Sequence, residues 1–493
     1  MPKTLIGGSW AIGRNGARHL FRSVPAAMAL MALSAGSAMA AGEGAPHLNG
    51  AELNLLWVIP FAGILLSIAI FPLVAGEFWH HHFGKISALW ALSFLVPFAL
   101  IFGFDLALYE VIHVGLLEYI PFIILLLSLF TVAGGVRVTG TLRGTPEMNT
   151  GILLLGTVIA SWMGTTGAAM LLIRPILNAN EDRKHKVHVV VFFIFLVANV
   201  GGSLTPLGDP PLFLGFLKGV SFFWPTTHML APMALVSVIL LVLFYGIDKY
   251  FWAKESEEVR AVPSTAGEKI ALEGKFNILL LAGVVGAVLL SGVWKPGISL
   301  VIYHVPWDIQ NIVRDVLLLA IAFISWKVTS LESRLANGFT WFPILEVAKL
   351  FAGIFLTIIP AIAILKAGTD GSLRDVVSAV STETGEPVNM AYFWLTGILS
   401  SFLDNAPTYL VFFNTAGGDA QELMGPMANT LLAISAGAVF MGANSYIGNA
   451  PNFMVKAIAE ERGIAMPSFF GYMIWSGLIL MPIFLLISFV FFA

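Results

Sequence analysis

The fold of this chain is decided by the stretch ANVGGSLTPLGDPPLF, residues 198–213. It interrupts a segment that is otherwise apolar and long enough to cross a bilayer. Pro210 and Pro211 lack an amide hydrogen, and their rings clash with carbonyl groups four residues earlier, so a helix that enters this stretch must unwind. Unwound backbone at membrane depth is tolerated only where it is buried in protein or lines a wet cavity. Asp209 makes that cavity a candidate ion site.

The composition of the chain predicts an all-α polytopic membrane protein surrounded by lipid. Of its 493 residues, 58% are hydrophobic and 11% are charged, and the mean hydropathy is +0.87. So little polar surface cannot cover a soluble globule, whereas a bilayer needs no such cover. The net charge of −3 gives no argument for nucleic acid, and the absence of Cys excludes disulfides and thiolate sites. Without a P-loop motif or a nucleophile–base pair, the sequence predicts no cofactor, no ATP drive and no enzyme.

The N-terminus has the pattern of a secretory signal peptide over residues 1–40. A basic region without acids covers 1–22, a short apolar run covers 24–33, and residues 38–40 read Ala-Met-Ala. This order of basic region, short core and small-residue site predicts cleavage after residue 40. The alternative is an uncleaved first helix. Cleavage implies a bacterial-type inner membrane protein with its mature N-terminus outside the cytoplasm.

Ten apolar segments are long enough to span a membrane. They lie near 53–75, 84–104, 119–134, 188–217, 228–249, 275–294, 309–327, 344–366, 428–456 and 468–492. Two more stretches, 149–178 and 389–416, are too polar at their centres for a plain span. We expect each of these to form a re-entrant helical hairpin.

The basic residues of short loops predict the orientation of the spans, because cytoplasmic loops are enriched in Lys and Arg. Arg137 and Arg143 precede the first hairpin, and Arg183 and Lys184 follow it. Both ends of that hairpin are therefore predicted to be cytoplasmic. Counting spans forward places the acidic stretch 415–427 outside, so the second hairpin enters from the outside.

The two halves of the chain match at an offset of 240 residues. The first hairpin reads SWMGTTGA at 161–168, and the second reads SFLDNAPT at 401–408. The second broken segment reads GANSYIGNAPNF at 442–453, so Asn449 stands where the first half has Asp209. With opposite orientations, this pattern indicates an inverted repeat with its substrate site where the broken elements meet. The predicted units are a first repeat over 41–249, a cytoplasmic linker over 250–274 and a second repeat over 275–493.

These motifs resemble a known group of membrane proteins. The run NVGGSLTPLGDPP at 199–211 resembles the Asn-Ile-Gly-Gly…Thr-Pro-Ile-Gly pattern of the ion-transporter superfamily. This group includes divalent-anion symporters, arsenite permeases, NhaD-type sodium/proton antiporters and the CitMHS-like citrate transporter family. The element FLDNAP at 402–407 is similar to the Asp-Asn-x-Pro element of the NhaD-type branch. The resemblance implies a homodimer with a scaffold domain at its interface and a transport domain made mainly from 145–220 and 389–460.

The hairpin tips depart from the dicarboxylate symporters of that group, which carry Ser-Asn-Thr at both tips. Here the tips read Gly-Thr-Thr at 164–166 and Asp-Asn-Ala at 404–406. A hairpin acid is an awkward neighbour for a dianion and suits a cation or a proton better. An intramembrane carboxylate can hold either one, and oxygen ligands suit alkali cations rather than zinc or copper.

The candidate ion- or substrate-binding residues share polar, oxygen-bearing side chains near the four breaks. They are Asp209, Asp404, Asn405, Thr165, Thr166, Asn199, Ser203, Thr205, Asn444, Ser445, Asn449 and Asn452. The candidates for sodium itself are Asp209, Asp404, Asn405 and Asn449.

Each candidate also has a structural interpretation. Either Asp can be the N-cap of a helix that re-forms after the break. The Asn and Thr side chains can be polar contacts between helices. Arg174 either pairs with an anionic substrate or reaches the cytoplasmic interface, and the His run at 80–82 is a solvated cytoplasmic loop or a metal site.

The sequence therefore predicts an inverted-repeat secondary transporter with two re-entrant hairpins and two broken transmembrane helices. Sodium/proton antiport by alternating access is the first hypothesis, because two intramembrane carboxylates lie among oxygen ligands. The alternative is a cation-coupled symporter of citrate or a related organic anion, in which Arg174, Thr165 and Thr166 face the anion. Oxyanion efflux is less favoured without Cys, and a channel or non-transporting scaffold is a more distant alternative.

Overall fold

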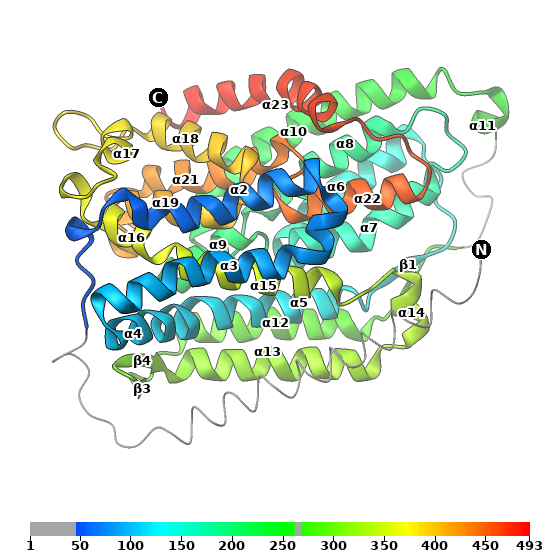
Figure 1. Ribbon diagram of the computed structural model, residues 1–493. Coiled ribbons are helices and arrows are strands. Elements are labelled where there is room, and N and C mark those ends of the chain that lie inside the picture. Colours follow the sequence, from blue (N-terminus) through cyan, green and yellow to red (C-terminus); the bar gives the residue numbers. More distant parts are fainter. Residues whose placement is uncertain (1–45, 262–268) are drawn as a thin grey trace.

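The computed structural model describes residues 46–261 and 269–493, and the signal peptide expected over 1–40 lies outside them. Within the described residues the chain is mainly helical, and Figure 1 shows its long helices lying side by side along one common direction. Helices satisfy every backbone polar group internally, as a bilayer requires. The chain is thus an all-α polytopic membrane protein, as its composition predicts.

Seven helical segments in the described part of the chain are long and apolar enough to cross a membrane. They are α2 (Ile59–Val74) with its preceding turn η2 (Leu55–Val58), α3 (Gly76–Phe102), the continuous run of α4 (Phe104–Val114), the π-helical turn η3 (Gly115–Tyr119) and α5 (Ile120–Ala133), α10 (Trp224–Trp252), α12 (Phe276–Val293), α13 (Ile309–Val328) and α23 (Phe469–Phe491). An eighth span is bent by 41° between α15 (Phe342–Thr357) and α16 (Ile359–Lys366). Pro360 in the first turn of α16 explains this bend.

Two further spans are broken at the two stretches predicted from the sequence. In the first, α8 (Val187–Leu196) and α9 (Pro210–Leu217) flank the short turn η4 (Val200–Ser203). In the second, α21 (Ala428–Met441) and α22 (Ala450–Glu461) flank η6 (Gly442–Asn444). The second helix of each broken span, α9 or α22, carries Pro in its first turn, where the missing amide hydrogen of Pro costs no hydrogen bond.

Two helical hairpins enter the molecule from opposite ends. The first consists of α6 (Pro146–Met163) and α7 (Thr165–Ala179), and the second of α18 (Asn389–Phe402) and α19 (Asn405–Thr415). Figure 1 shows the first entering from the end that holds α14 (Leu331–Ala336), and the second from the end that holds α17 (Arg374–Ala379). Each predicted span and hairpin thus corresponds to a helix, a broken helix or a helix pair.

Short elements cap the two ends of the bundle. Within residues 46–261 and 269–493 there are two antiparallel strand pairs, β1 (Arg137–Thr139) with β2 (Ala271–Glu273) and β3 (Ser299–Ile302) with β4 (Val305–Asp308). The remaining short helices are η1 (Gly50–Glu52), α11 (Glu257–Ala261), η5 (Gly368–Asp370) and α20 (Ala420–Met424). Strands of three or four residues leave no readable alternation, so the sequence did not predict them.

One local prediction was wrong. The His run at 80–82 lies inside α3, not in a loop. The rings of His81 and His82 hydrogen-bond the carbonyl groups of Glu77 and Phe78, one turn earlier, and His80 stacks on Phe342. The rings of His81 and His82 therefore find their hydrogen-bond partners within α3, and the His run does not interrupt this helix.

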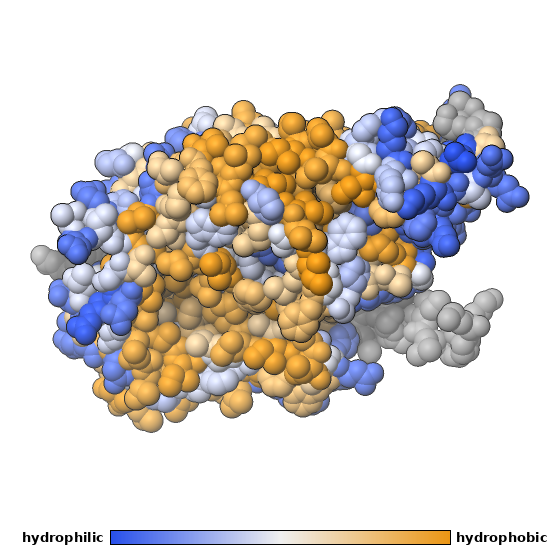
Figure 2. Space-filling model, turned by 90° about the horizontal axis from the view of Figure 1, so that it is seen from above, coloured by the Kyte–Doolittle hydropathy of each residue, from blue (hydrophilic) through white to orange (hydrophobic). Residues whose placement is uncertain are grey.

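Apolar side chains cover the middle of the surface and also form two large interior clusters. Figure 2 shows a broad hydrophobic band between two hydrophilic ends, as expected for a protein that crosses a bilayer. The first cluster packs the hairpins with α8, α10, α21 and α23. The second packs α2 to α5 with α12, α15 and α16, and it also takes in Phe213 and Leu214 of α9. Leu212 of α9 belongs to the first cluster, so the second half of the first broken helix contacts both clusters.

Candidate functional site

Each broken helix is held in its unwound form by a close approach of its own backbone. A Cβ atom on Gly208 would lie 2.1 Å from the carbonyl oxygen of Gly202. In the second break, a Cβ on Gly448 would lie 2.5 Å from the carbonyl oxygen of Gly442. Only glycine permits such an approach. The two contacts involve positions that differ by 240 residues.

Ser161 of the first hairpin clamps the first break. Its Oγ donates to the carbonyl of Gly201 at 2.5 Å and accepts the backbone N–H of Leu204 at 2.9 Å. Its own carbonyl accepts the hydroxyl of Thr205. One serine thus satisfies three backbone or side-chain groups that the unwound helix leaves without partners.

Ser401 of the second hairpin occupies the matching place at the second break. Its Oγ lies 2.7 Å from the carbonyl of Gly397 in its own helix and 3.1 Å from that of Met441, and it accepts the side-chain amide of Asn444 at 2.9 Å. Its carbonyl accepts the hydroxyl of Ser445. Met441, Asn444 and Ser445 stand 240 positions after the partners of Ser161. The two serines therefore contact matching positions, although Ser161 accepts a backbone N–H and Ser401 a side-chain amide.

The helix that follows each broken span caps one freed carbonyl group. Thr226 of α10 donates its hydroxyl to the carbonyl of Leu204 at 2.5 Å, and Ser476 of α23 donates to that of Asn444 at 2.7 Å. Leu204 and Asn444 are again 240 positions apart. Ser203 hydrogen-bonds the carbonyl of Val200. Of the predicted site residues, Ser203, Thr205, Asn444 and Ser445 therefore hold the breaks in shape.

Asp209 lies at the point where the hairpins and the broken helices meet. It is 1% exposed. Its Oδ1 accepts the Thr165 hydroxyl at 3.1 Å and the Asn449 amide at 3.0 Å, and its Oδ2 accepts the Asn405 amide at 2.5 Å. The structure thus brings four predicted residues together around one carboxylate.

These four residues are also the starting points of four helices. Thr165 and Asn405 are the first residues of α7 and α19, and Asp209 and Asn449 are the N-cap residues of α9 and α22. Each helix N-terminus carries a partial positive charge. Four of them around Asp209 favour the ionised carboxylate or another anion at this point.

The Asn side chains connect the second break to the first. Asn199 donates to Oδ1 of Asn452 at 2.7 Å, and Asn449 donates to the carbonyl of Ala198 at 3.1 Å and to Oδ1 of Asn199 at 3.2 Å. Oδ1 of Asn405 and of Asn444 are buried and have no hydrogen-bond partner among the described residues. Because a buried acceptor without a partner is costly, these two oxygens suit a donor or a cation.

Asp404 has a different environment from Asp209. It is half-buried, and its Oδ1 accepts the backbone N–H of Ala406 at 3.0 Å as the N-cap of α19. Asp209 occupies the N-cap position of α9 but makes no capping hydrogen bond with its side chain. The capping interpretation therefore holds for Asp404 and fails for Asp209, whose carboxylate is directed at its three side-chain donors.

A cavity of about 110 Å³ opens beside Asp209. Its polar wall is formed by Asp209, Thr165 and Thr166, and its apolar wall by side chains of α5 and α15, among them Phe122 and Ile344. None of the described residues that line it is Lys, Arg or His. The cavity therefore presents one carboxylate and two hydroxyl groups to a ligand, with no fixed positive side chain.

Arg174 does not line this cavity. Its guanidinium packs against Gly338 in the loop between α14 and α15, where a Cβ would lie 2.1 Å from a terminal nitrogen of Arg174. Gly338 has a φ of +63°. Arg174 is thus placed at the end of the first hairpin, as the interfacial interpretation predicts, and away from Asp209.

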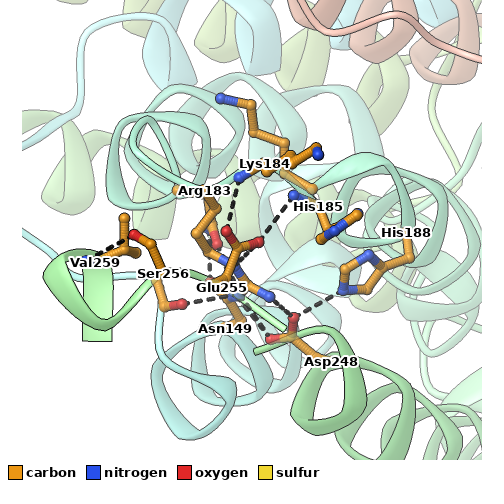
Figure 3. Close-up of polar contacts among 12 residues, drawn as sticks. Asn149, Arg183, Lys184, His185, His188, Asp248, Glu255, Ser256 and Val259 are labelled. Carbon is orange, nitrogen blue, oxygen red and sulfur yellow. Dashed lines mark hydrogen bonds and ion pairs between the residues drawn. The ribbon is translucent and has the colours of Figure 1, made fainter. Parts of the chain in front are cut away.

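A second polar cluster, which the sequence did not reveal, ties the base of the first hairpin to α10 (Figure 3). Asp248 of α10 pairs with Arg183 and accepts from Asn149 at 2.9 Å, and it lies 2.7 Å from Nε2 of His188. Glu255 accepts the backbone N–H groups of Lys184 and His185. Asp248 and Arg183 are almost completely buried. Arg183 was visible only as a basic loop residue, because nothing in the sequence names its partner.

The two clamping serines, Ser161 and Ser401, are absent from the candidate residues named from the sequence. Ser161 and Ser401 stand at matched positions of the repeat, and this spacing is the signal that identifies them. The apolar wall from α5 and α15 carries no such signal, since those residues resemble any other lipid-spanning segment.

Comparisons with known proteins agree with this architecture. A family model described as "Putative citrate transport" matches residues 50–492. An uncharacterized transporter of Mycobacterium tuberculosis and one of Mycobacterium bovis are each 24% identical over 364 residues, which cover 69% of this chain and 78% of each relative. A 46 kDa membrane protein of Mycobacterium leprae is 23% identical over 361 residues, which cover 69% of this chain and 79% of that protein.

Proposed function

This chain belongs to the family described as "Putative citrate transport", and from that premise we propose that it is a secondary active transporter that exchanges sodium ions for protons at Asp209. The family and the named relatives support transport rather than catalysis. The inner-membrane location, the external mature N-terminus and the homodimer stay predictions.

The observation that carries the proposal is the set of partners of Asp209. All three of its hydrogen-bond donors, Thr165, Asn405 and Asn449, are neutral. An ionised carboxylate at the bilayer centre costs about 2.5–3.5 kcal/mol. Each hydrogen bond to a charged group returns about 1.5–3 kcal/mol. The three donors together offset the cost of the ionised form, and a proton or a cation that enters the site can neutralise its charge.

Mutually exclusive occupation of one carboxylate is the basis of exchange. When Asp209 is protonated it cannot hold sodium, and when it holds sodium it releases its proton. Carboxylate, hydroxyl and amide oxygens are ligands that alkali cations accept. The Asp209 carboxylate, the Thr165 hydroxyl and the unpartnered oxygen of Asn405 would hold the ion. Alternating access to the two sides then couples the two flows.

Cation-coupled transport of citrate is the second candidate. The four helix N-termini around Asp209 favour an anion once a cation has neutralised that carboxylate. The family description also points to citrate. The cavity argues against a free trianion, because it offers no basic side chain and Arg174 packs elsewhere.

The test uses the purified protein in liposomes with membrane potential clamped. Addition of sodium should drive protons across the membrane, as reported by an internal pH dye. If one carboxylate binds both ions, the half-saturating sodium concentration should rise about tenfold for each unit by which the pH is lowered, over the range in which that carboxylate is mainly protonated. Absence of sodium-driven proton movement would exclude antiport. Uptake of radiolabelled citrate that requires sodium or a divalent metal would instead support the second candidate.

A further inference from the structure

A second cavity, of about 420 Å³, lies at the other end of the bent span formed by α15 and α16. The central cavity meets Pro343 and Ile344 at the start of α15, whereas this one meets Ile359 and Lys366 of α16. By the predicted orientation it faces the outside. We call it the outer cavity.

One ion pair crosses the wall of the outer cavity. Nζ of Lys218 lies 2.5 Å from Oε1 of Glu118. Glu118 is 4% exposed, and its Oε2 has no hydrogen-bond partner among the described residues. It sits in the π-helical turn η3, a rare feature often found at functional sites. This pair is a short contact between segments 100 residues apart.

The pair is connected to the central site by a single short helix. Asp209 is the N-cap of α9, and Lys218 is its C-cap nine residues later. Lys218 therefore ends the helix whose start holds the central carboxylate. Any displacement of α9 that reorients Asp209 also moves Lys218 relative to Glu118.

The other charges of the outer cavity do not replace this contact. Glu110 and His113 come from α4 and Lys366 from α16. In the described part of the chain, none of these three residues forms an ion pair with Glu118 or Lys218. If Lys218 withdraws, the buried Glu118 loses its direct partner, and an uncompensated buried charge is unfavourable.

We propose that Glu118 and Lys218 form a latch that keeps the outer end closed by holding α9 against the α4–α5 segment. The latch must open before the central site can face the outside. This inference rests on the proposed alternating access, but its first test, the rate of thiol labelling, does not depend on sodium or proton transport.

The chain has no Cys, so single cysteines can report the opening of the outer cavity. Ile359→Cys places a thiol in its wall at a position that is 5% exposed. The label is a membrane-impermeant thiol reagent added to intact cells. In the Lys218→Met background, which keeps the length of the side chain, the labelling rate should rise roughly fivefold or more. Phe223→Cys, at a residue that is 50% exposed, is the reference and should label equally in every background.

The matched control is Lys366→Met, which removes a charge from the same cavity. Lys366 interacts with Glu118 and Lys218 only at longer range and forms no ion pair with Glu118 within 4.0 Å. Its substitution should accelerate labelling much less than Lys218→Met. Reversal of the pair, Glu118→Lys with Lys218→Glu, should restore slow labelling. Equal labelling in the Lys218→Met and unmodified backgrounds would overturn the proposal, as would equal acceleration by Lys366→Met.

A second measurement guards against misfolding of the charge variants. Glu118→Cys with Lys218→Cys can be bridged by a short bifunctional methanethiosulfonate, which forms a disulfide with each thiol and releases methanesulfinate. Bridging should stop whatever transport the unbridged protein shows, and a reducing agent that cleaves the bridge should restore it. Full transport by the bridged protein would show that this contact never opens.

Discussion

Asn449 donates its amide hydrogen to Oδ1 of Asp209 at 3.0 Å, so two residues that hold the same place in the two halves of the chain meet directly. They are not interchangeable. Asn449 also donates to the carbonyl of Ala198 and to Oδ1 of Asn199, whereas Asp209 accepts from three donors. One position therefore requires a donor and the other an acceptor.

Asp209→Asn should abolish ion coupling while the protein still folds. The amide group can keep the Thr165 and Asn449 hydrogen bonds, and rotation of the Asn405 amide would turn its unpartnered oxygen towards the new N–H. Removing only the hydrogen-bond partner of a metal ligand costs roughly 10–100-fold in affinity, so loss of the ligand should cost about 100-fold or more. The dependence of proton flux on sodium concentration in liposomes measures this loss of affinity. Asp375→Asn, at a fully exposed acid, is the control and should transport normally.

Asn449→Asp should be more damaging to stability than Asp209→Asn. It places a second carboxylate against Asp209 and leaves the carbonyl of Ala198 and Oδ1 of Asn199 without their donor. Each buried acceptor without a partner costs about 1–3 kcal/mol, and the two acids cannot both ionise at this distance. The apparent melting temperature should fall well below that of Asp209→Asn. For the same reason the exchange of both residues should not restore transport, and a fully active double variant would contradict this account.

Asp404→Asn should leave most of the transport activity intact. Asp404 caps α19 through the N–H of Ala406, and Asn caps helices about as well as Asp. We expect a loss of less than about tenfold in flux, whereas Asp404→Ala should cost about 1 kcal/mol of stability through loss of the cap. Flux and thermal melting of the two variants distinguish the roles. A loss with Asp404→Asn as large as that of Asp209→Asn would make Asp404 a direct ion ligand.

Gly208→Ala should prevent assembly of the first break. Its Cβ would lie 2.1 Å from the carbonyl oxygen of Gly202, and neither atom can move away without a shift of the backbone. We expect a loss of about 3 kcal/mol or more of stability, measured as a fall in melting temperature or in the yield of folded protein. Gly151→Ala in α6 is the matched control, because nothing lies within 4 Å of its added Cβ. It should be neutral or stabilising by up to about 1 kcal/mol.

Asp248→Leu should destabilise the base of the first hairpin. It removes the carboxylate that pairs with the buried Arg183, and loss of one partner from a buried pair typically costs about 3–5 kcal/mol. The control is Asp375→Leu, whose pair with Arg374 is solvent-exposed and should contribute little to stability. Thermal melting in detergent compares the two. Equal melting temperatures would show that the cluster in Figure 3 adds nothing to stability.

The arrangement of spans was predictable from the sequence because it depends on local properties. Apolar length, prolines inside apolar segments and basic loops each act within about 20 residues. The offset of 240 residues then linked the two halves. For the central site this was enough to name Thr165, Asp209, Asn405 and Asn449, which the structure brings into contact.

The roles within the site were less predictable, because they depend on contacts between distant segments. The sequence gives no sign that Asp404 caps a helix while Asp209 does not, since both precede a helix that carries Pro in its first turn. Nor does it reveal that Lys218 meets Glu118 or that Asp248 meets Arg183. Such pairs are set by packing in three dimensions and leave no spacing to read.

The serine clamps suggest how such a protein arises. Each half carries its own hairpin serine and its own glycine contact at one constant offset, and each is followed by its own capping helix. A gene for half of this chain would therefore already encode a complete clamp, and two copies inserted in opposite directions would supply all four helix starts. After duplication and fusion, one copy is free to keep a carboxylate and the other to keep an amide. Such an origin would make the single central charge of Asp209 a product of divergence between the two halves.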